Sequence, residues 1–206
     1  MKLAGSLAHH LAFAARRTPQ ARALRFGEQR WTFAELLAEA GALGATLGGT
    51  AAPLIFAGDS LHLARHAYAC SLENRPLWPV DRNRSVHWTG ELPPRVALVI
   101  ATSGSEGEPR GVMLSNANLD AAAAAANRHL PLKAGDLWLD CLPLYHIGGL
   151  AILWRCARAG ASVLLHDGFD AATVAADLAR QPVTHLSLVP AMLSSLLETG
   201  VAPPAS

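Results

Sequence analysis

The sequence has few charged residues and no dominant sign of charge. Only 16% of its 206 residues are Asp, Glu, Lys or Arg, and the formal net charge is +1. It also lacks a cluster of Lys and Arg residues interleaved with aromatic side chains, the pattern typical of nucleic-acid-binding surfaces. These absences exclude recognition driven by a strong basic field, and we expect no nucleic-acid partner.

Cysteine is scarce. The three cysteines, Cys70, Cys141 and Cys156, are odd in number and widely spaced, and each lies in an apolar segment. This usage is typical of buried thiols in a reducing compartment rather than of a disulfide framework. We therefore expect no disulfide and a cytoplasmic location.

Long hydrophobic runs are missing as well. No stretch approaches the ~20 apolar residues that a membrane span needs, so no span is predicted. Residues 2–15 resemble a secretory signal, but His9 and His10 interrupt the apolar run, and Leu7 and Leu11 keep helical spacing. This segment is predicted to be an amphipathic surface helix.

What the sequence does have is alternating structure. Hydrophobic residues make up 51% of the chain, which is enough for a well-buried core. A helix, a hairpin around Gly27 and a second helix are predicted first, and from residue 95 onward apolar runs alternate with helical stretches. The apolar runs are 96–101, 137–142, 162–165 and 186–189, and the helical stretches are 116–129, 149–159 and 171–180. This pattern predicts an α/β fold with a parallel sheet flanked by helices.

Residues 81–94 are polar and rich in Gly and Pro, which predicts a connector. It separates an N-terminal α/β lobe (1–80) from a βα lobe (95–206), both parts of one large domain.

Residues 102–111 read TSGSEGEPRG and directly follow the apolar run 96–101. Three glycines permit close backbone approach, three hydroxyls can donate hydrogen bonds, and Arg110 supplies a cation, a combination that suits a polyphosphate. The segment matches neither GxxxxGK[ST] nor the dinucleotide-binding GxGxxG.

This loop resembles that of the adenylate-forming superfamily of acyl-CoA synthetases, luciferases and peptide-synthetase adenylation domains, [ST]-[SG]-G-[ST]-[ST]-G-x-P-K-G. Glu106 and Arg110 depart from it, where Thr or Ser and Lys are usual. The resemblance implies the N-terminal part of such a ligase. It also implies that the following residues bind ATP phosphates: Thr102, Ser103, Gly104, Ser105, Glu106, Gly107, Pro109, Arg110 and Gly111.

Two later segments extend the resemblance. Residues 142–150, LPLYHIGGL, are similar to the family's P-[LM]-[FY]-H-x-x-G segment, and residues 185–193, HLSLVPAML, to its Val-Pro segment. Together they look like the corresponding segments of o-succinylbenzoate-CoA ligases of menaquinone synthesis, although aryl- and fatty-acyl-CoA ligases have similar sequences there. By this resemblance Arg110 and His146 are catalytic, and the residues at the acid are Tyr145, His146, Gly148, Gly149 and Pro190.

The implied reaction joins a carboxylic acid to ATP as an acyl-adenylate, with Mg²⁺ assisting, and then transfers the acyl group to coenzyme A. The family's adenine and ribose contacts and its catalytic lysine come later than residue 206, so the chain alone is expected not to complete thioester synthesis. A non-catalytic nucleotide- or acyl-binding module with the same loop stays an alternative.

Two other patterns are weaker indications of function. His62 and His66 have a spacing that can bind a metal, but no third ligand is nearby, so no metal site is predicted. Ser103 and Ser105 lie in no GxSxG motif, which argues against a serine hydrolase.

Overall fold

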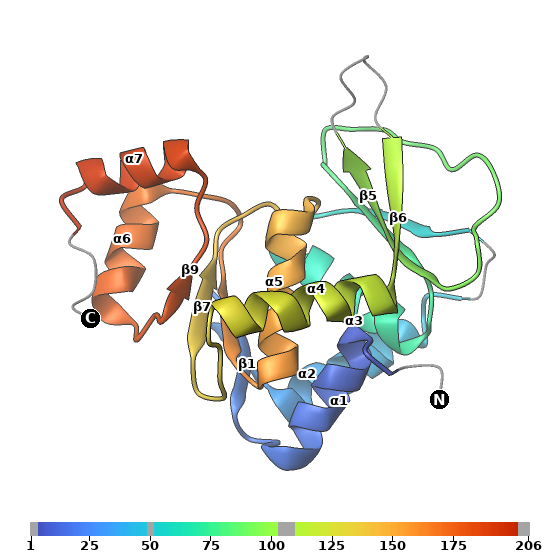
Figure 1. Cartoon of the computed structure of the whole chain (residues 1–206), viewed down its shortest axis with the longest axis horizontal. Coiled ribbons are helices and arrows are strands. Elements are labelled where there is room, and N and C mark those ends of the chain that lie inside the picture. Colours follow the sequence, from blue (N-terminus) through green and yellow to red (C-terminus); the bar gives the residue numbers. More distant parts are fainter. Residues whose placement is uncertain (1–3, 49–51, 103–109, 202–206) are drawn as a thin grey trace.

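The computed structural model describes residues 4–48, 52–102 and 110–201. Within these ranges the strands form two sheets (Figure 1). The first has the order β2-β1-β8-β7-β9 and the second β3-β4-β5-β6. The strands of the first are β1 (Arg22–Phe26), β2 (Gln29–Thr32), β7 (Leu137–Asp140), β8 (Ser162–Leu165) and β9 (His185–Leu186). Those of the second are β3 (Leu54–Ala57), β4 (Leu77–Val80), β5 (Val96–Thr102) and β6 (Arg110–Ser115).

Both sheets are mixed. The pairs β1–β2 and β5–β6 are antiparallel, whereas β1–β8, β3–β4, β4–β5, β7–β8 and β7–β9 are parallel. The predicted α/β class with flanking helices is confirmed. The sheets are not wholly parallel, because a hairpin adds one antiparallel strand to each.

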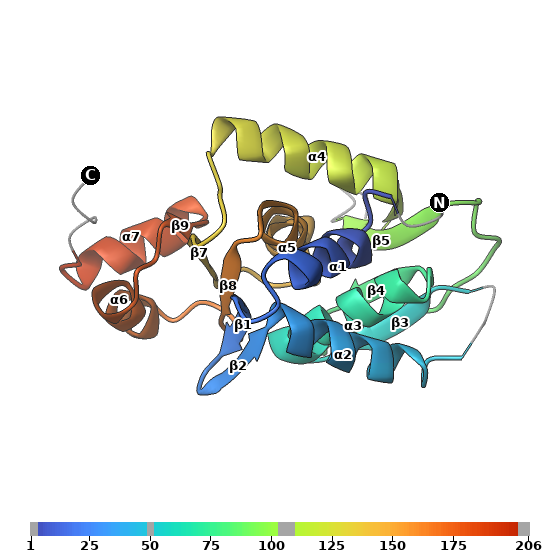
Figure 2. The same cartoon turned by 90° about the horizontal axis from the view of Figure 1, so that it is seen from below.

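Helices fill the space between the two sheets and cover the far face of the first one (Figure 2). Helices α1 to α5 contribute buried residues to one core that both sheets share, and α6 and α7 belong to a second, smaller core. Their bounds are α1 (Leu7–Arg17), α2 (Phe33–Gly44), α3 (Ser60–Leu72), α4 (Asn116–His129), α5 (Ile147–Ala159), α6 (Ala171–Arg180) and α7 (Pro190–Glu198).

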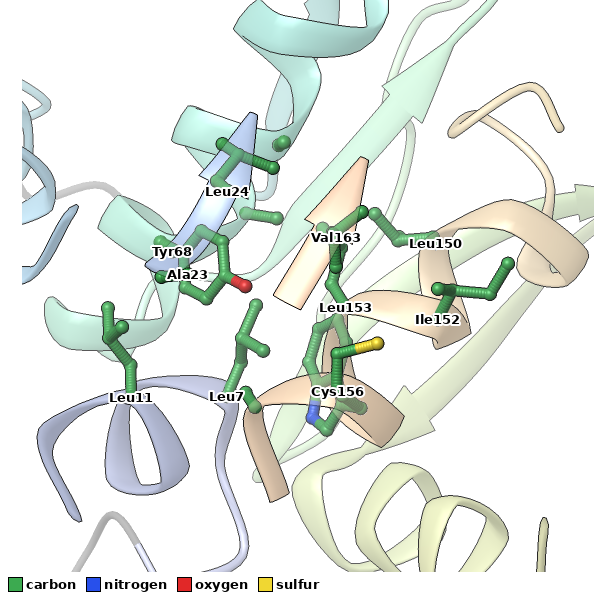
Figure 3. Packing of buried hydrophobic residues seen from close by; sticks show 14 of the residues in the cluster. Leu7, Leu11, Ala23, Leu24, Tyr68, Leu150, Ile152, Leu153, Cys156 and Val163 are labelled. Atoms are coloured by element: carbon green, nitrogen blue, oxygen red, sulfur yellow. The ribbon is translucent and has the colours of Figure 1, made fainter. Parts of the chain in front are cut away.

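Successive strand residues face opposite sides of a sheet, and this period of two divides the cores. In β8, Val163 and Leu165 pack into the large core, whereas Leu164 faces the smaller core under α6 and α7. Figure 3 shows Val163 among side chains from α1, α3 and α5, including Leu7 and Leu153. Strands buried on both faces explain the continuous apolar runs of the sequence.

The helix starts follow from local sequence. At most N-termini, a Ser, Thr or Asp side chain accepts a hydrogen bond from a backbone N–H of the first turn, which would otherwise have no partner. These residues are Ser6, Thr32, Asp59, Ser115 and Asp170. Pro190 opens α7, where its fixed φ suits the first helical position.

Each sheet combines strands from both sides of the predicted connector. β1 pairs with β8, and β4 pairs with β5 through Leu77 and Leu98. Residues 81–94 contain no helix or strand, although Val86, Trp88 and Leu92 pack against the small core of Trp78, Val80 and Val99 in the second sheet. No helix in the described part of the chain is long and apolar enough to cross a membrane.

Candidate active site

The carboxyl ends of strands from both sheets meet around two adjoining hollows. Ligands of α/β proteins commonly bind outside the carboxyl ends of the strands. The larger hollow has a volume of about 390 Å³, and residues that follow β3, β4, β7 and β8 line it. Its lining is Gly58, Ser60, Leu63, Asp81, Arg82, Asn83, Pro143, Leu144, Tyr145, Asp167 and Gly168.

The smaller hollow, of about 120 Å³, brings three of the predicted site residues together. Thr102, at the end of β5, lines it opposite the turn that carries Tyr145 and His146. Its other lining residues are Pro79, Val80, Asp81, Arg84, Val86 and Ala101. Gly148, Gly149 and Pro190 line neither hollow among the described residues, so their contact with an acid stays a prediction.

The turn after β7 positions Tyr145 and His146. The Leu142 N–H donates to Asp140 Oδ1 at 3.1 Å, and the His146 N–H donates to the Pro143 carbonyl at 3.1 Å. His146 is the N-cap residue of α5 with extended backbone, and its exposed side chain makes no capping bond. The imidazole contacts the Tyr145 ring, with the ring centroids 4.6 Å apart, and is exposed to a ligand.

Gly149 allows helix α5 to approach this turn. A Cβ at position 149 would lie 2.8 Å from the carbonyl oxygens of both Leu142 and Pro143. Backbone atoms cannot move aside as a flexible side chain does. Glycine at 149 therefore has a packing reason, whereas a Cβ at Gly148 would come no nearer than 3.6 Å to Leu142.

Asp81 and Tyr145 form a polar pair shared by the two hollows. A hydrogen bond from the Asn83 backbone N–H (2.9 Å) lowers the pKa of the Asp81 carboxyl, and the bond from the Tyr145 hydroxyl acts in the same direction. Burial raises the pKa of the Tyr145 hydroxyl, as does the neighbouring Asp81 charge. At neutral pH an ionised carboxylate thus accepts from a neutral phenol.

Asp167 joins the two sheets at the rim of the larger hollow. Its Oδ1 accepts from the Ser60 N–H at the start of α3 (2.9 Å), and its Oδ2 accepts from Arg82 (2.8 Å). Ser60 and Arg82 follow strands of the second sheet, whereas Asp167 follows β8 of the first. An acid at a helix N-terminus is also favoured by the helix dipole.

The predicted phosphate loop is closed at its base by the β5–β6 hairpin. Thr102 pairs with Arg110 and Ala101 with Gly111, and residues 103–109, with the predicted site residues Ser103 to Pro109, lie outside the described residues. At Gly111 a Cβ would lie 3.0 Å from Val99 Cγ1, so this glycine fits the sheet closely. The loop therefore leaves the sheet beside the smaller hollow, as Thr102 lines it.

Sequence reasoning missed four charged residues of this region: Asp81, Arg82, Arg84 and Asp167. The first three were assigned to a connector. A usable signal was present, since Asp81 and His166-Asp167 directly follow the buried strands β4 and β8.

Comparison with protein families matches residues 57–205 to the AMP-binding enzymes. The chain belongs to the AMP-binding enzyme family. The match includes both hollows and the loop between β5 and β6, which agrees with the resemblance seen in the sequence.

Curated relatives carry a more specific name. The 2-succinylbenzoate–CoA ligase of Bacillus licheniformis is 38% identical over 125 residues, which cover 61% of this chain and 25% of that protein. The ligase of the same name from Bacillus mycoides is 39% identical over 100 residues, covering 48% of this chain and 21% of that protein. These alignments thus span about a quarter or less of the relatives' length.

Solved structures agree with the fold. O-succinylbenzoate coenzyme A synthetase from Bacillus subtilis, in complex with AMP, is similar with a TM-score of 0.81 and 25% identity over 95% of this chain and 65% of that one. A protein from Rhodopseudomonas palustris described as a long-chain-fatty-acid CoA ligase has a TM-score of 0.80 at 20% identity, covering 94% of this chain and 65% of that one. The second likeness concerns the fold alone.

Proposed function

We propose that this chain forms the phosphate- and acid-binding part of an ATP-dependent acid–CoA ligase that works through an acyl-adenylate. The observation that carries the proposal is the shared lining of one hollow by Thr102, Tyr145 and His146. Thr102 begins the phosphate loop, and Tyr145 and His146 belong to the segment that resembles the family's acid-binding turn. A carboxylate bound there would lie next to the phosphates it must attack, and such positioning lowers the barrier substantially.

In this proposal the loop 102–111, with Arg110, holds the β- and γ-phosphates of ATP. The side chains of Tyr145 and His146 orient the acid, and Gly148, Gly149 and Pro190 border its remaining part. An acid oxygen attacks the α-phosphorus as pyrophosphate leaves, and coenzyme A then displaces AMP from the acyl group. Magnesium, which binds mainly through substrate phosphates, offsets their charge.

For the acid we propose 2-succinylbenzoate, which would place the enzyme in menaquinone synthesis in the cytoplasm. The names of the two Bacillus relatives support this acid. The three thiols, all buried and unpaired, suit a reducing compartment.

The test is a binding and turnover assay on the purified chain. MgATP and 2-succinylbenzoate are titrated separately, and pyrophosphate and thioester are measured with ATP, Mg²⁺, coenzyme A and a panel of aryl and fatty acids. We expect MgATP binding to depend on Arg110 and acid binding to depend on His146, with no thioester formed by the chain alone.

Robust turnover would show that this chain is already a sufficient ligase and that its expected incompleteness is wrong. A second assay uses this chain fused to the downstream half of a relative. If the fusion also binds MgATP and an acid but releases no pyrophosphate, the non-catalytic binding module is favoured. A chain that binds neither ligand contradicts both readings.

A further inference from the structure

The smaller hollow is matched in size to one compact apolar group. Its volume is about 120 Å³, and Pro79, Val80, Val86 and Ala101 provide apolar wall. A protein cavity of about 150 Å³ is enough to hold a benzene ring. The hollow is slightly smaller than that, so it suits part of a ring or a short aliphatic segment, with polar groups at its edges.

Two charged side chains at the smaller hollow, Asp81 and Arg84, differ in the hydrogen bonds they make. Asp81 accepts from the backbone N–H and the side-chain amide of Asn83 at 2.9 and 3.2 Å, and the Tyr145 hydroxyl bonds to it as well. The Arg84 backbone N–H donates to the Asp81 carbonyl at 3.0 Å, and the Arg84 charge lowers the pKa of the Asp81 carboxyl and opposes the rise in the pKa of the Tyr145 hydroxyl. Within the described residues, no carboxylate lies within ion-pair distance of the Arg84 guanidinium and no hydrogen bond engages it.

Arg82 provides the contrast two residues earlier. Its guanidinium donates to Asp167 Oδ2 at 2.8 Å and lines the larger hollow. Arg82 is thus committed to the fold, whereas Arg84 lines the smaller hollow and its guanidinium makes no hydrogen bond within the described part of the chain. An arginine fork is well suited to a carboxylate, because two parallel N–H groups match its two oxygens.

We propose that Arg84 selects acids with a second carboxylate, binding that group while the reacting carboxylate lies toward Thr102 and His146. The inference rests on the proposed function, and it assigns a specificity role to a residue of the segment 81–94. An acid that has only the reacting carboxylate would leave the guanidinium in water and gain nothing from it. A dicarboxylic acid whose carboxylates are separated by a ring-sized spacer would engage both ends of the hollow.

The experiment measures the binding of three acids to the full chain by calorimetry. The probes are 2-succinylbenzoate, 2-propanoylbenzoate, which lacks the succinyl carboxylate, and 4-oxo-4-phenylbutanoate, which lacks the ring carboxylate. Wild type should bind the dicarboxylic acid about tenfold or more tightly than the monoacid that lacks the carboxylate held by Arg84, the low end for a charge-assisted pair at an exposed site. Arg84→Gln should abolish that advantage, and Arg84→Lys should restore part of it.

One monoacid should bind with unchanged affinity to Arg84→Gln. The carboxylate that this monoacid lacks is the one that Arg84 holds. Arg128→Gln, on α4 and away from both hollows, is the matched control for the loss of one positive charge. Equal weakening of all three acids, unchanged binding of the dicarboxylic acid, or no binding of any acid overturns the proposal. Arg110-dependent MgATP binding reports on the proposed function independently, so each can fail without the other.

Discussion

At the scale of single residues, Asp140 is the acid whose surroundings oppose its charge most. It lies at the end of β7 with 0% of its surface exposed, and within the described residues its Oδ2 has no hydrogen-bond partner. Burial raises the pKa of this carboxyl well above its usual value, against the opposing effects of the Leu142 N–H and the Arg155 charge. At pH values between the unfolded and the folded pKa, the folded chain therefore keeps a proton that the unfolded chain releases.

This gives a pH-dependent prediction. With a raised pKa in the folded state, the stability linked to Asp140 is fully present below the unfolded pKa of about 3.9 and is lost as the pH rises toward the folded value. We expect Asp140→Asn, which cannot ionise, to gain in free energy of unfolding relative to wild type as the pH rises from about 4 to about 8. Urea unfolding at several pH values measures the difference.

Asp170→Asn is the control with the opposite sign. Hydrogen bonds from Thr173 lower the pKa of Asp170, so the stability linked to it is present above the unfolded pKa and is lost on acidification. Identical pH profiles for wild type and Asp140→Asn would show that Asp140 carries its charge at no cost.

The sequence predicted the site residues that belong to a recognisable motif and missed the others. His146 and Thr102 were found through two motifs, and the structure places both at one hollow. Arg84 and Asp81 were not, because polarity and turn residues predict a loop but not which loop faces the strand ends. That information lies in strand order, which local sequence does not encode.

At the scale of elements, the junction of the 141–146 turn with α5 allows a matched pair of substitutions. Gly149→Ala would push a Cβ against two carbonyl oxygens at 2.8 Å, whereas Gly148→Ala meets only a side-chain methyl at 3.6 Å. We expect Gly149→Ala to lower the free energy of unfolding by about 1–3 kcal/mol, as overpacking does. Gly148→Ala should be neutral or stabilising by up to about 1 kcal/mol, since alanine favours helix.

Denaturant unfolding measures both variants, and acid titration adds a second reading. If Gly148 leaves room for the acid, Gly148→Ala should weaken acid binding without loss of stability. Two variants of equal stability would contradict the packing role assigned to Gly149.

Most elements follow from local pattern, with one clear exception. Helix α4 spans Asn116–His129 after the Ser115 cap, as the helical stretch 116–129 predicted. Within it, only Ala123 of the six alanines 121–126 is buried. Strand β6 was missed, because the end of the glycine-rich loop and the start of the predicted helix left no recognisable strand between them.

At the scale of the whole molecule, Asp167 links the two sheets. We expect Asp167→Ala to lower the free energy of unfolding by about 1 kcal/mol, below the usual range for hydrogen bonds to charged groups because the site is partly exposed. The loss should shrink in high salt, which screens the pair with Arg82. Thermal or urea unfolding checks this, with Glu28→Ala as a control, since Glu28 makes only exposed contacts at 4.0 Å. A stability loss confined to the control would refute the link.

The joining of distant segments could not be predicted from the sequence. β1 pairs with β8, and Ser162 Oγ donates to the Arg22 carbonyl at 2.8 Å, across 140 residues. The repeated βα pattern predicted the class correctly, but two sheets with shared helices satisfy that pattern as well as one sheet does. Burial on both faces of β7 and β8 distinguishes one sheet from two only when the strands that pair with them are known.

The central claim, a phosphate-binding loop beside an acid-binding turn, is tested most directly by calorimetric titration of MgATP into wild type, Arg110→Ala and Arg110→Lys. We predict that Arg110→Ala weakens binding by about 1.5–3 kcal/mol, the range for hydrogen bonds to charged groups, while Arg110→Lys costs little because it keeps the charge. Unchanged affinity in Arg110→Ala, or no binding of MgATP to wild type, would contradict the account.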